Sequence, residues 1–165
     1  MDATPNPTEA RDIMEPVLVW LSPEESLKDA ALKIASAGSI GDSSGAPGLV
    51  VVDESVRLVG VVSQHDVLRA MVPDYMTMLD LAEFTWDEML PEMAVRVAGR
   101  RVADVMGDHA VSVREDAPLM ECADLVVIHR LESVPVVDAG GRVVGVVHVR
   151  DLYRAVVGVL FPQTS

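Results

Sequence analysis

Two places in the sequence combine a carboxylate with hydroxyl or basic side chains where an apolar strand gives way to a helix. Residues 60–66 read GVVSQHD, and residues 145–151 read GVVHVRD. An ionised carboxylate such as Asp66 can accept hydrogen bonds from two neighbouring hydroxyls, for example those of a ribose, and the Ser63 hydroxyl can donate to a phosphate oxygen. Free N–H groups at a helix start also favour anions. The recurring junction is therefore a candidate site for a ligand with hydroxyl and anionic groups.

One copy of this pattern has a simpler explanation, because Ser-x-x-Asp is also an ordinary cap at a helix N-terminus. The second copy changes the balance. Asp66 and Asp151 occupy matching positions, and each directly follows a possible cation, His65 or Arg150. This recurrence favours a ligand site over a cap alone.

The two junctions belong to an internal repeat. Val51-Val52-Asp53 precedes the first and Val136-Val137-Asp138 the second, at a constant spacing of 85 residues. Earlier in each copy, Asp12-Ile13-Met14 is echoed by Asp104-Val105-Met106 at a spacing of 92 residues, so the first copy carries seven extra residues, which map onto the glycine-rich loop at 38–47. Self-similarity of this kind predicts two copies of one small folding unit.

The composition is that of a globular protein with an acidic surface. The chain has 165 residues, half of them apolar, and a formal net charge of −13. Such a chain can bury one core, or two half-sized cores with a shared interface. Its negative charge repels nucleic acid and anionic membranes, so neither is an expected partner. Its apolar runs all fall short of the roughly 20 residues that a membrane-spanning helix needs.

Targeting and reactive-residue patterns point to a non-enzymatic protein in the cytoplasm. The N-terminus lacks the regions of a signal peptide, and the single cysteine, Cys122, cannot form an intramolecular disulfide. We interpret Cys122 as a core residue of a helix rather than a nucleophile. His65, His109, His129 and His148 do not have metal-ligand spacings, so no metal site is expected. Nucleophile-elbow, Walker and dinucleotide-binding motifs are absent from the sequence, so no enzymatic activity is expected.

Hydrophobic periodicity predicts a β-α-β-β-α unit in the first copy, residues 11–72, after a flexible N-terminus at 1–10. The first helix has the clearest start, with Ser22 as N-cap, Pro23 in the first helical position and Glu25 completing a capping box. The expected elements are a strand at 17–21, a helix from 23 to about 37, strands at 49–52 and 58–62, and a helix at 64–71.

The second copy, residues 102–160, repeats this order. Its last helix ends with Val156, Val157, Val159 and Leu160, which are too apolar for a solvated end, so we expect a subunit contact there and a homodimer. Its expected elements are a strand at 110–113, a helix at 117–131, strands at 134–137 and 142–147, and a helix at 149–160.

Residues 73–101 form an expected helical linker between the copies, and residues 161–165 a C-terminal tail. The linker is rich in methionine and aromatic residues. Stripes of such residues at helical spacing are usually core, and a partner-binding face is the alternative. The residues concerned are Met76, Met78, Phe84, Trp86, Met89 and Met93.

Together these features resemble a pair of CBS domains (named for cystathionine β-synthase), the arrangement called a Bateman module. The resemblance rests on the tandem β-α-β-β-α units, the Asp-Ile-Met and Asp-Val-Met segments, the VPVVD strand at 134–138 and the Gly-h-h-Ser/Thr-x-x-Asp junction, where h is hydrophobic. It covers roughly residues 11–157, and no separate catalytic domain is expected. It implies an α/β (α+β) fold in which the two repeats pack through their sheets.

The resemblance also implies a function. Such modules bind an adenosine-containing nucleotide, of the AMP, ADP, ATP or S-adenosylmethionine type, in the cleft between two repeats. They signal its presence by a conformational change to a regulated protein, here unidentified. The nucleotide is a regulatory ligand, and no cofactor is required.

Individual residues acquire roles from this resemblance. In the family the Ser/Thr contacts phosphate and the Asp holds the ribose hydroxyls, which points to Ser63, Asp66 and Asp151, with His65 and Arg150 as phosphate contacts. The backbone of the first strand and of the strand with a hydrophobic-Pro pair lines the adenine pocket. The corresponding residues here are Val17, Val50, Val51, Ala110, Val134 and Pro135.

Departures from the family pattern leave other functions open. His148 stands where Ser or Thr is usual, and Leu49-Val50 replaces the hydrophobic-Pro pair, so we expect unequal sites. One alternative is therefore a protein–protein interaction or dimerisation module with degenerate clefts. Another is a metal-linked or hydrolytic protein, which would need clustered carboxylates. The net charge argues against polyphosphate ligands unless arginines gather near the site, the candidates being Arg57, Arg69, Arg142 and Arg150.

Overall fold

The computed structural model describes residues 6–37, 48–73, 89–107 and 110–162. The chain divides into two compact units: unit 1 contains Met1–Leu18, Val52–Val59 and His109–Ser165, and unit 2 contains Val19–Val51 and Gly60–Asp108. The units do not coincide with the sequence repeats. Each combines most of one repeat with the opening segment of the other.

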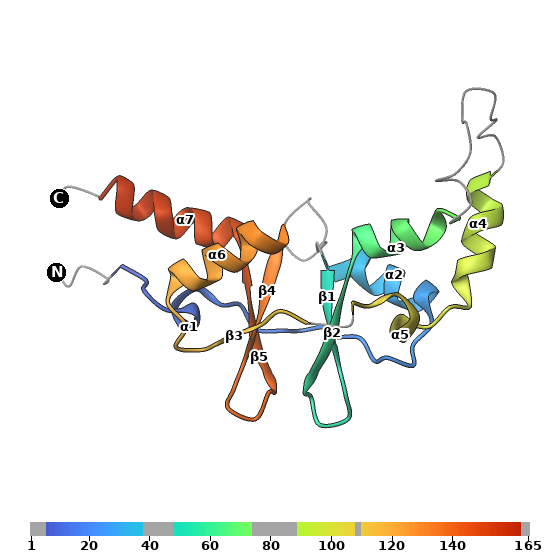
Figure 1. Ribbon diagram of the computed structural model, residues 1–165, viewed down its shortest axis with the longest axis horizontal. Helices are drawn as coiled ribbons and strands as arrows, with labels where there is room; N and C mark the ends of the chain where they lie inside the picture. The colour runs from blue at the N-terminus through green and yellow to red at the C-terminus, as the bar shows by residue number, and fades with distance from the viewer. Residues whose placement is uncertain (1–5, 38–47, 74–88, 108–109, 163–165) are drawn as a thin grey trace. The chain divides into compact units, whose positions relative to one another are not determined.

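Unit 1 is built around a three-stranded sheet in the order β3-β4-β5 (Figure 1). β3 runs parallel to β4, and β4 pairs antiparallel with β5, with a register shift between Val136 and Val137. Helix α6 packs against β4 and helix α7 against β5. The elements are α1 (Ala10–Ile13), β3 (Val113–Arg114), α6 (Leu119–His129), β4 (Ser133–Val137), β5 (Val143–His148) and α7 (Val149–Leu160).

The core of unit 1 lies between this sheet and its helices. Four successive residues of β4 are buried, whereas β5 alternates buried and partly exposed positions, because only one face of β5 is packed. The prediction that Cys122 is a core residue is confirmed, and burial raises the pKa of its thiol. The buried cluster comprises Ala10, Val113, Ala117, Cys122, Val134, Val136, Val147 and Leu152.

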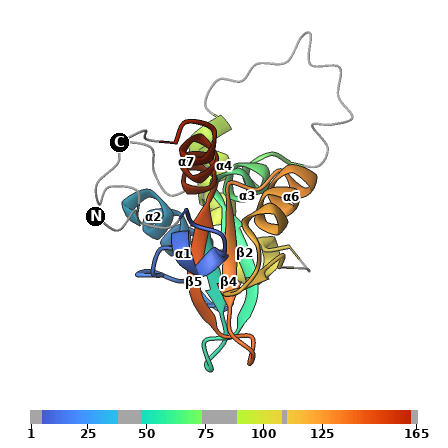
Figure 2. The same ribbon diagram turned by 90° about the vertical axis from the view of Figure 1, so that its left-hand side faces the viewer.

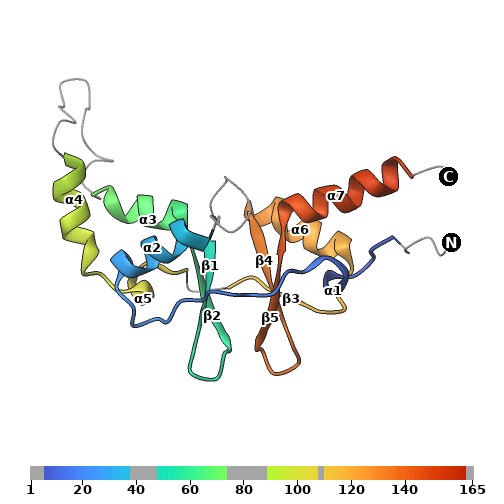
Figure 3. The ribbon, with the colours of Figure 1, turned by 180° about the vertical axis from the view of Figure 1, so that it is seen from behind.

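Unit 2 has a two-stranded sheet, β1-β2, and its own helices (Figure 3). Helices α2, α3 and α4 pack against one another, and α3 also contacts α5. Its buried residues include Leu21, Leu27, Val51, Val62 and Val102. The elements are α2 (Leu27–Ala37), β1 (Gly48–Val52), β2 (Leu58–Ser63), α3 (Gln64–Met71), α4 (Met89–Ala98) and α5 (Val102–Val105).

Most predicted elements are confirmed, but the predicted strand at 17–21 is wrong. Among these residues only Leu21 pairs, in an isolated parallel bridge with Val51. Leu18 and Trp20 are exposed, because the extended segment has no partner strand along its length. In the second repeat the predicted strand at 110–113 is likewise shorter, since only Val113 of that range belongs to β3.

The predicted start of the first long helix is also wrong, because α2 begins at Leu27 rather than Pro23. The expected bond from the Ser22 N–H to the Glu25 carboxylate is present at 2.7 Å, but it closes a turn. The carbonyls of Pro23 and Glu25 accept hydrogen bonds from the N–H groups of Ala103 and Val102 in α5, each at 2.9 Å. These two carbonyls therefore make tertiary hydrogen bonds instead of the bonds of a first helical turn.

The second repeat shows the same effect. Helix α6 begins at Leu119 rather than Ala117, and the Ala117 carbonyl accepts the N–H of Ala10 in α1 at 2.8 Å. Figure 2 shows α1 beside β5, with which it is in contact.

Part of the predicted linker can be compared with the structure. α4 confirms helix at 89–98, and Met93 is buried there, as expected of a core residue. The 38–47 loop, His109 and four linker residues, Met76, Met78, Phe84 and Trp86, lie outside the described residues.

The two hairpin turns are built alike but differ at one strained position. In each, an aspartate carboxylate accepts two backbone N–H groups: Asp53 those of Ser55 and Arg57, and Asp138 those of Gly140 and Arg142. At the matching fourth position, Val56 has φ 63° and Gly141 has φ 80°. A β-branched residue is strained in this left-handed region, whereas glycine is not.

We expect Val56→Gly to raise the free energy of unfolding by roughly 0.5–1 kcal/mol. The substitution relieves the backbone strain, and the greater flexibility of glycine in the unfolded chain cancels part of that gain. The reciprocal change, Gly141→Val, should lower it by about 1–2 kcal/mol. Urea denaturation monitored by circular dichroism measures both. A loss of stability in Val56→Gly would contradict the strain.

Candidate ligand-binding junctions

The two junctions are fixed by a methionine that packs on a glycine of the preceding strand. A Cβ built on Gly60 would lie 2.7 Å from the Met106 sulfur, and one on Gly145 would lie 2.8 Å from the Met14 sulfur and 3.0 Å from the Glu15 carbonyl. These glycines therefore permit a close approach that a side chain would prevent. In each unit the methionine comes from the other sequence repeat.

In unit 2 the junction between β2 and α3 is a complete helix cap. The Ser63 N–H and hydroxyl donate to Asp66 Oδ2 at 2.8 and 2.7 Å, and the Ser63 oxygen accepts the Asp66 N–H at 3.1 Å. This is the reciprocal capping box that Ser-x-x-Asp also predicts. One carboxylate oxygen of Asp66 is thus already occupied within the protein.

The basic side chains of this junction, His65 and Arg69, lie on the first two turns of α3. Arg69 Nη1 is 3.5 Å from Asp66 Oδ1, and Arg69 Nη2 is 2.9 Å from His65 Nδ1. His65 and Arg69 are exposed, whereas Asp66 is partly buried. The structure therefore brings Ser63, His65 and Asp66 together, and with them Arg69, one of the four arginines expected to gather near a site.

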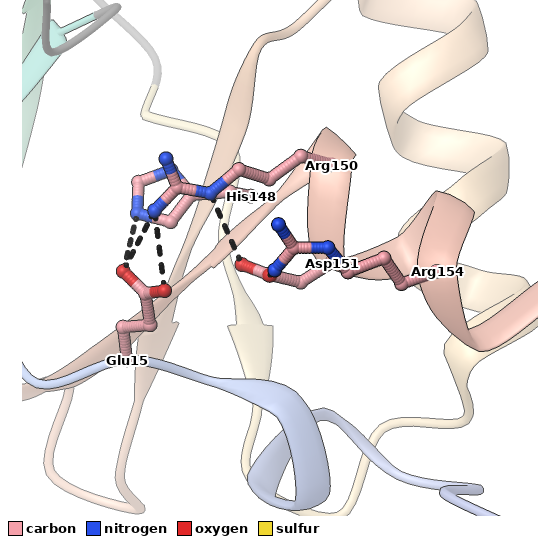
Figure 4. A network of polar contacts seen from close by, with 5 residues as sticks. All are labelled: Glu15, His148, Arg150, Asp151 and Arg154. Atoms are coloured by element: carbon pink, nitrogen blue, oxygen red, sulfur yellow. Dashed lines mark hydrogen bonds and ion pairs between the residues drawn. The ribbon is translucent and has the colours of Figure 1, made fainter. Parts of the chain in front are cut away.

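In unit 1 the junction between β5 and α7 has the same backbone but no side-chain cap. His148 occupies the N-cap position and makes no capping hydrogen bond. Its Nε2 lies 3.4 Å from Glu15 Oε2, and Arg150 Nη2 lies 3.2 Å from both Glu15 oxygens (Figure 4). Where Ser63 caps its own helix, the matching His148 instead contacts Glu15, a residue near the N-terminus.

Asp151 is correspondingly less satisfied than Asp66. Its Oδ1 is 3.4 Å from Arg154 Nη1, and its Oδ2 is 3.8 Å from Arg150 Nε (Figure 4). Oδ2 is buried and makes no hydrogen bond. A buried acceptor without a hydrogen-bond donor is costly; Asp151 Oδ2 has a charged neighbour in Arg150 but none of the hydrogen-bond donors that Asp66 Oδ2 has.

The predicted adenine-lining residues of β4 and β1 are close to these junctions. Ser133 pairs with His148 and Val134 with Val147 across β4 and β5, and Pro135 follows in the same buried strand. In unit 2, Gly48 at the start of β1 lies against Ser63: a Cβ atom added to Gly48 would be 3.1 Å from Ser63 Cα. Val50 and Val51 are buried further along β1.

Other candidates lie apart from the junctions. Val17 and Ala110, predicted in first strands, are in neither case part of a strand. Arg57 and Arg142 pair with each other in an isolated bridge at the hairpin turns, one strand length from Ser63 and His148. Of the four arginines proposed to gather near a site, only Arg69 and Arg150 do so.

Two residues of the unit 1 junction were missed from the sequence. Arg154 could have been found, because the 85-residue spacing maps it onto Arg69. Glu15 had no such signal, because 135 residues separate it from Arg150.

The environment of His148 disfavours its protonated form. Burial lowers its pKa below 6.5, and neighbouring Arg150 lowers it further, while Glu15 and Asp151 oppose the shift. The imidazole is therefore mainly neutral at pH 7.

Comparison with known proteins identifies both repeats. The model of the family described as "CBS domain" matches residues 10–73 and 102–158. A curated relative, the chloroplastic CBS domain-containing protein CBSX2 of Arabidopsis thaliana, is 30% identical over 120 residues, which cover 66% of this chain and 48% of that protein. The inosine-5'-monophosphate dehydrogenase of Methanocaldococcus jannaschii is 25% identical over 137 residues, but the match covers only 21% of that enzyme.

Solved structures agree in fold along most of the chain. The crystal structure of CBSX2 in complex with AMP has a TM-score of 0.65 and 26% identity, covering 93% of this chain and 98% of that one. The cytosolic domain of the Mg2+ channel MgtE in complex with ATP has a TM-score of 0.63 and 26% identity, covering 89% of this chain and 48% of that one. The predicted α+β fold with two tandem repeats is thereby confirmed.

The chain spans about half or less of the length of the curated relatives described above. Across its described residues, none of its helices has the length and apolar character needed to cross a membrane.

Because the folded-state pKa of His148 is lowered, protonation favours the unfolded chain, and stability should fall as pH drops through about 6.5. We expect the free energy of unfolding to decrease from about pH 7.5 to about pH 5.5, above the range in which most carboxylates titrate. The His148→Gln variant should lose part of this slope. The exposed His129→Gln variant is the control, and equal slopes in wild type and His148→Gln would contradict the assignment.

Proposed function

The chain belongs to the CBS domain family, and from this membership we propose that it is a regulatory module that senses an adenosine-containing nucleotide of the AMP, ADP, ATP or S-adenosylmethionine type. The AMP-bound and ATP-bound structures described above support the ligand class. The proposed role is regulatory, as in the family, and the match to the dehydrogenase covers a fifth of that enzyme.

The observation that carries this proposal is the buried Oδ2 of Asp151, which accepts no hydrogen bond from the described residues and whose ion-pair partner, Arg150 Nε, lies 3.8 Å away. Asp151 lies in the first turn of α7 and occupies the position that the repeat matches to Asp66. A ribose offers two adjacent hydroxyl donors to such a carboxylate. A hydrogen bond to Oδ2 would offset the cost of leaving this acceptor buried without a donor.

Nearby arginines make the site compatible with phosphate. Arg150 and Arg154 flank Asp151, and Arg69 lies beside Asp66. Guanidinium groups bind phosphate oxygens through paired N–H donors. The overall charge of −13 acts mainly at long range and is screened beyond roughly 8–10 Å at physiological ionic strength.

The two junctions differ in how readily their aspartate can accept hydrogen bonds from a ligand. At Asp66, ribose hydroxyls would compete with the Ser63 cap for Oδ2, whereas at Asp151 the corresponding oxygen accepts no hydrogen bond and has an Arg150 ion pair at 3.8 Å. We therefore expect the tighter ribose contact at Asp151. Signalling then requires that the ligand bind one conformation of the chain better than another.

A second proposal is assembly into a homodimer through the apolar end of α7. Val156, Val159, Leu160 and Phe161 are between 48% and 72% exposed. A group of large apolar side chains left in water favours association. This proposal also accommodates the alternative function, an interaction module with degenerate sites.

We expect Asp151→Ala to weaken nucleotide binding by about 1.5–3 kcal/mol, the range for a hydrogen bond to a charged group, and Asp66→Ala to weaken it less. Isothermal titration against AMP, ADP, ATP and S-adenosylmethionine measures both. Asp104→Ala is the matched control, because Asp104 caps α5 by accepting the Arg101 N–H at 3.0 Å. Unchanged binding in both test variants would refute the site, and no binding to folded wild type would refute the ligand class.

For the dimer, we expect sedimentation equilibrium to give twice the mass of 17.7 kDa, and Val159→Glu to shift it to the monomer. An exposed apolar residue on another helix provides the control, Val127→Glu in α6. A wild-type monomer at all concentrations would refute the contact.

A further inference from the structure

Glu15 places a negative charge of the protein itself on the cations of the unit 1 junction. Its backbone is held to β5 by two hydrogen bonds with Val146, Glu15 N–H to Val146 carbonyl and Val146 N–H to Glu15 carbonyl, each at 2.9 Å. Its carboxylate then meets Arg150 at 3.2 Å and His148 at 3.4 Å. The charge is therefore positioned by main-chain pairing rather than by a flexible loop.

Among the described residues, the other junction has no carboxylate at the position that matches Glu15. The 92-residue spacing that maps Met14 onto Met106 maps Glu15 onto Gly107. Gly107 is exposed, and a Cβ built on it would meet nothing within 4 Å. The equivalent position in unit 2 thus has room for a side chain but carries none.

The ion pairs of Glu15 contribute little to folding. The side chains of Glu15 and Arg150 are both 45% exposed, and solvent-exposed pairs of this kind typically stabilise a protein by less than about 1 kcal/mol. The Glu15 carboxylate can therefore be displaced from Arg150. An anion that binds Arg150 must displace this carboxylate and then remains close to its negative charge.

We propose that Glu15 is a specificity-determining residue that makes the β5–α7 junction discriminate against phosphate charge. This inference rests on the proposed nucleotide function. A ligand gains its ribose contact at Asp151 whatever its charge, whereas each phosphate charge is repelled by Glu15. The unit 1 junction then prefers adenosine-containing ligands with little or no negative charge over ATP.

The test compares adenosine, AMP and ATP by isothermal titration with wild type, Glu15→Gln and Gly107→Glu. We expect Glu15→Gln to tighten ATP binding about tenfold at unit 1, AMP less, and adenosine not at all. Gly107→Glu, which installs the charge in unit 2, should weaken ATP binding there by a similar factor and leave adenosine unchanged. Glu121→Gln removes one exposed charge on α6 and controls for net charge.

Amide NMR assigns each effect to its junction and adds a probe that needs no nucleoside. Pyrophosphate should shift the amides of Val149, Arg150 and Asp151 at lower concentration in Glu15→Gln than in wild type. If this occurs while no nucleotide binds, the role of Glu15 is supported and the nucleotide function fails.

Two results would overturn the inference. Equal ATP affinity at unit 1 in wild type and Glu15→Gln would refute the role of Glu15 while leaving nucleotide sensing intact. Folded Glu15→Gln that responds to neither pyrophosphate nor any nucleotide would refute both proposals.

Discussion

Each unit is closed by a short helix that comes from the opposite sequence repeat. In unit 1, α1 donates from Ala10 and Arg11 to the carbonyls of Ala117 and Glu115 at 2.8 and 2.9 Å; in unit 2, α5 makes the equivalent bonds to the loop before α2, at 2.9 Å. These bonds consume backbone groups that would otherwise be buried without partners. This pairing of each short helix with the opposite repeat, here called the crossed pairing, positions the two short helices. It also positions the methionine–glycine contacts and, through them, both junctions.

The crossing also gives each junction its chemistry. Because the N-terminal segment continues from α1 along β5, Met14 packs on Gly145 and the next residue, Glu15, arrives beside His148 and Arg150. In unit 2 the matching position is Gly107, and among the described residues the polar side-chain contacts of Ser63 and Asp66 are with each other and with Arg69. The crossed segment thus places a carboxylate at the unit 1 junction and, at the matching position in unit 2, a glycine.

The sequence predicted what local periodicity and capping determine. α3 and α7 have the predicted bounds, and the strands on either side of each hairpin agree within a residue, because alternation and turn residues are local signals. The starts of α2 and α6 were predicted too early, since their loop carbonyls bond to α5 and α1. At the sites, Ser63, Asp66 and Asp151 were predicted from the repeat, whereas Glu15 depends on a contact across 135 residues that no local pattern encodes.

Divergence between the junctions is balanced in charge. Unit 1 has two arginines, Arg150 and Arg154, against Glu15 and Asp151, while unit 2 has Arg69 against Asp66. The formal charges of these arginines and carboxylates cancel at both junctions. Compared with unit 2, unit 1 therefore has one more arginine and one more carboxylate at its junction, and the proposed selectivity rests on this difference. Glu15 is held to β5 by its backbone and meets Arg150 in the first turn of α7, so this contact ties the N-terminal segment to the junction across 135 residues of chain.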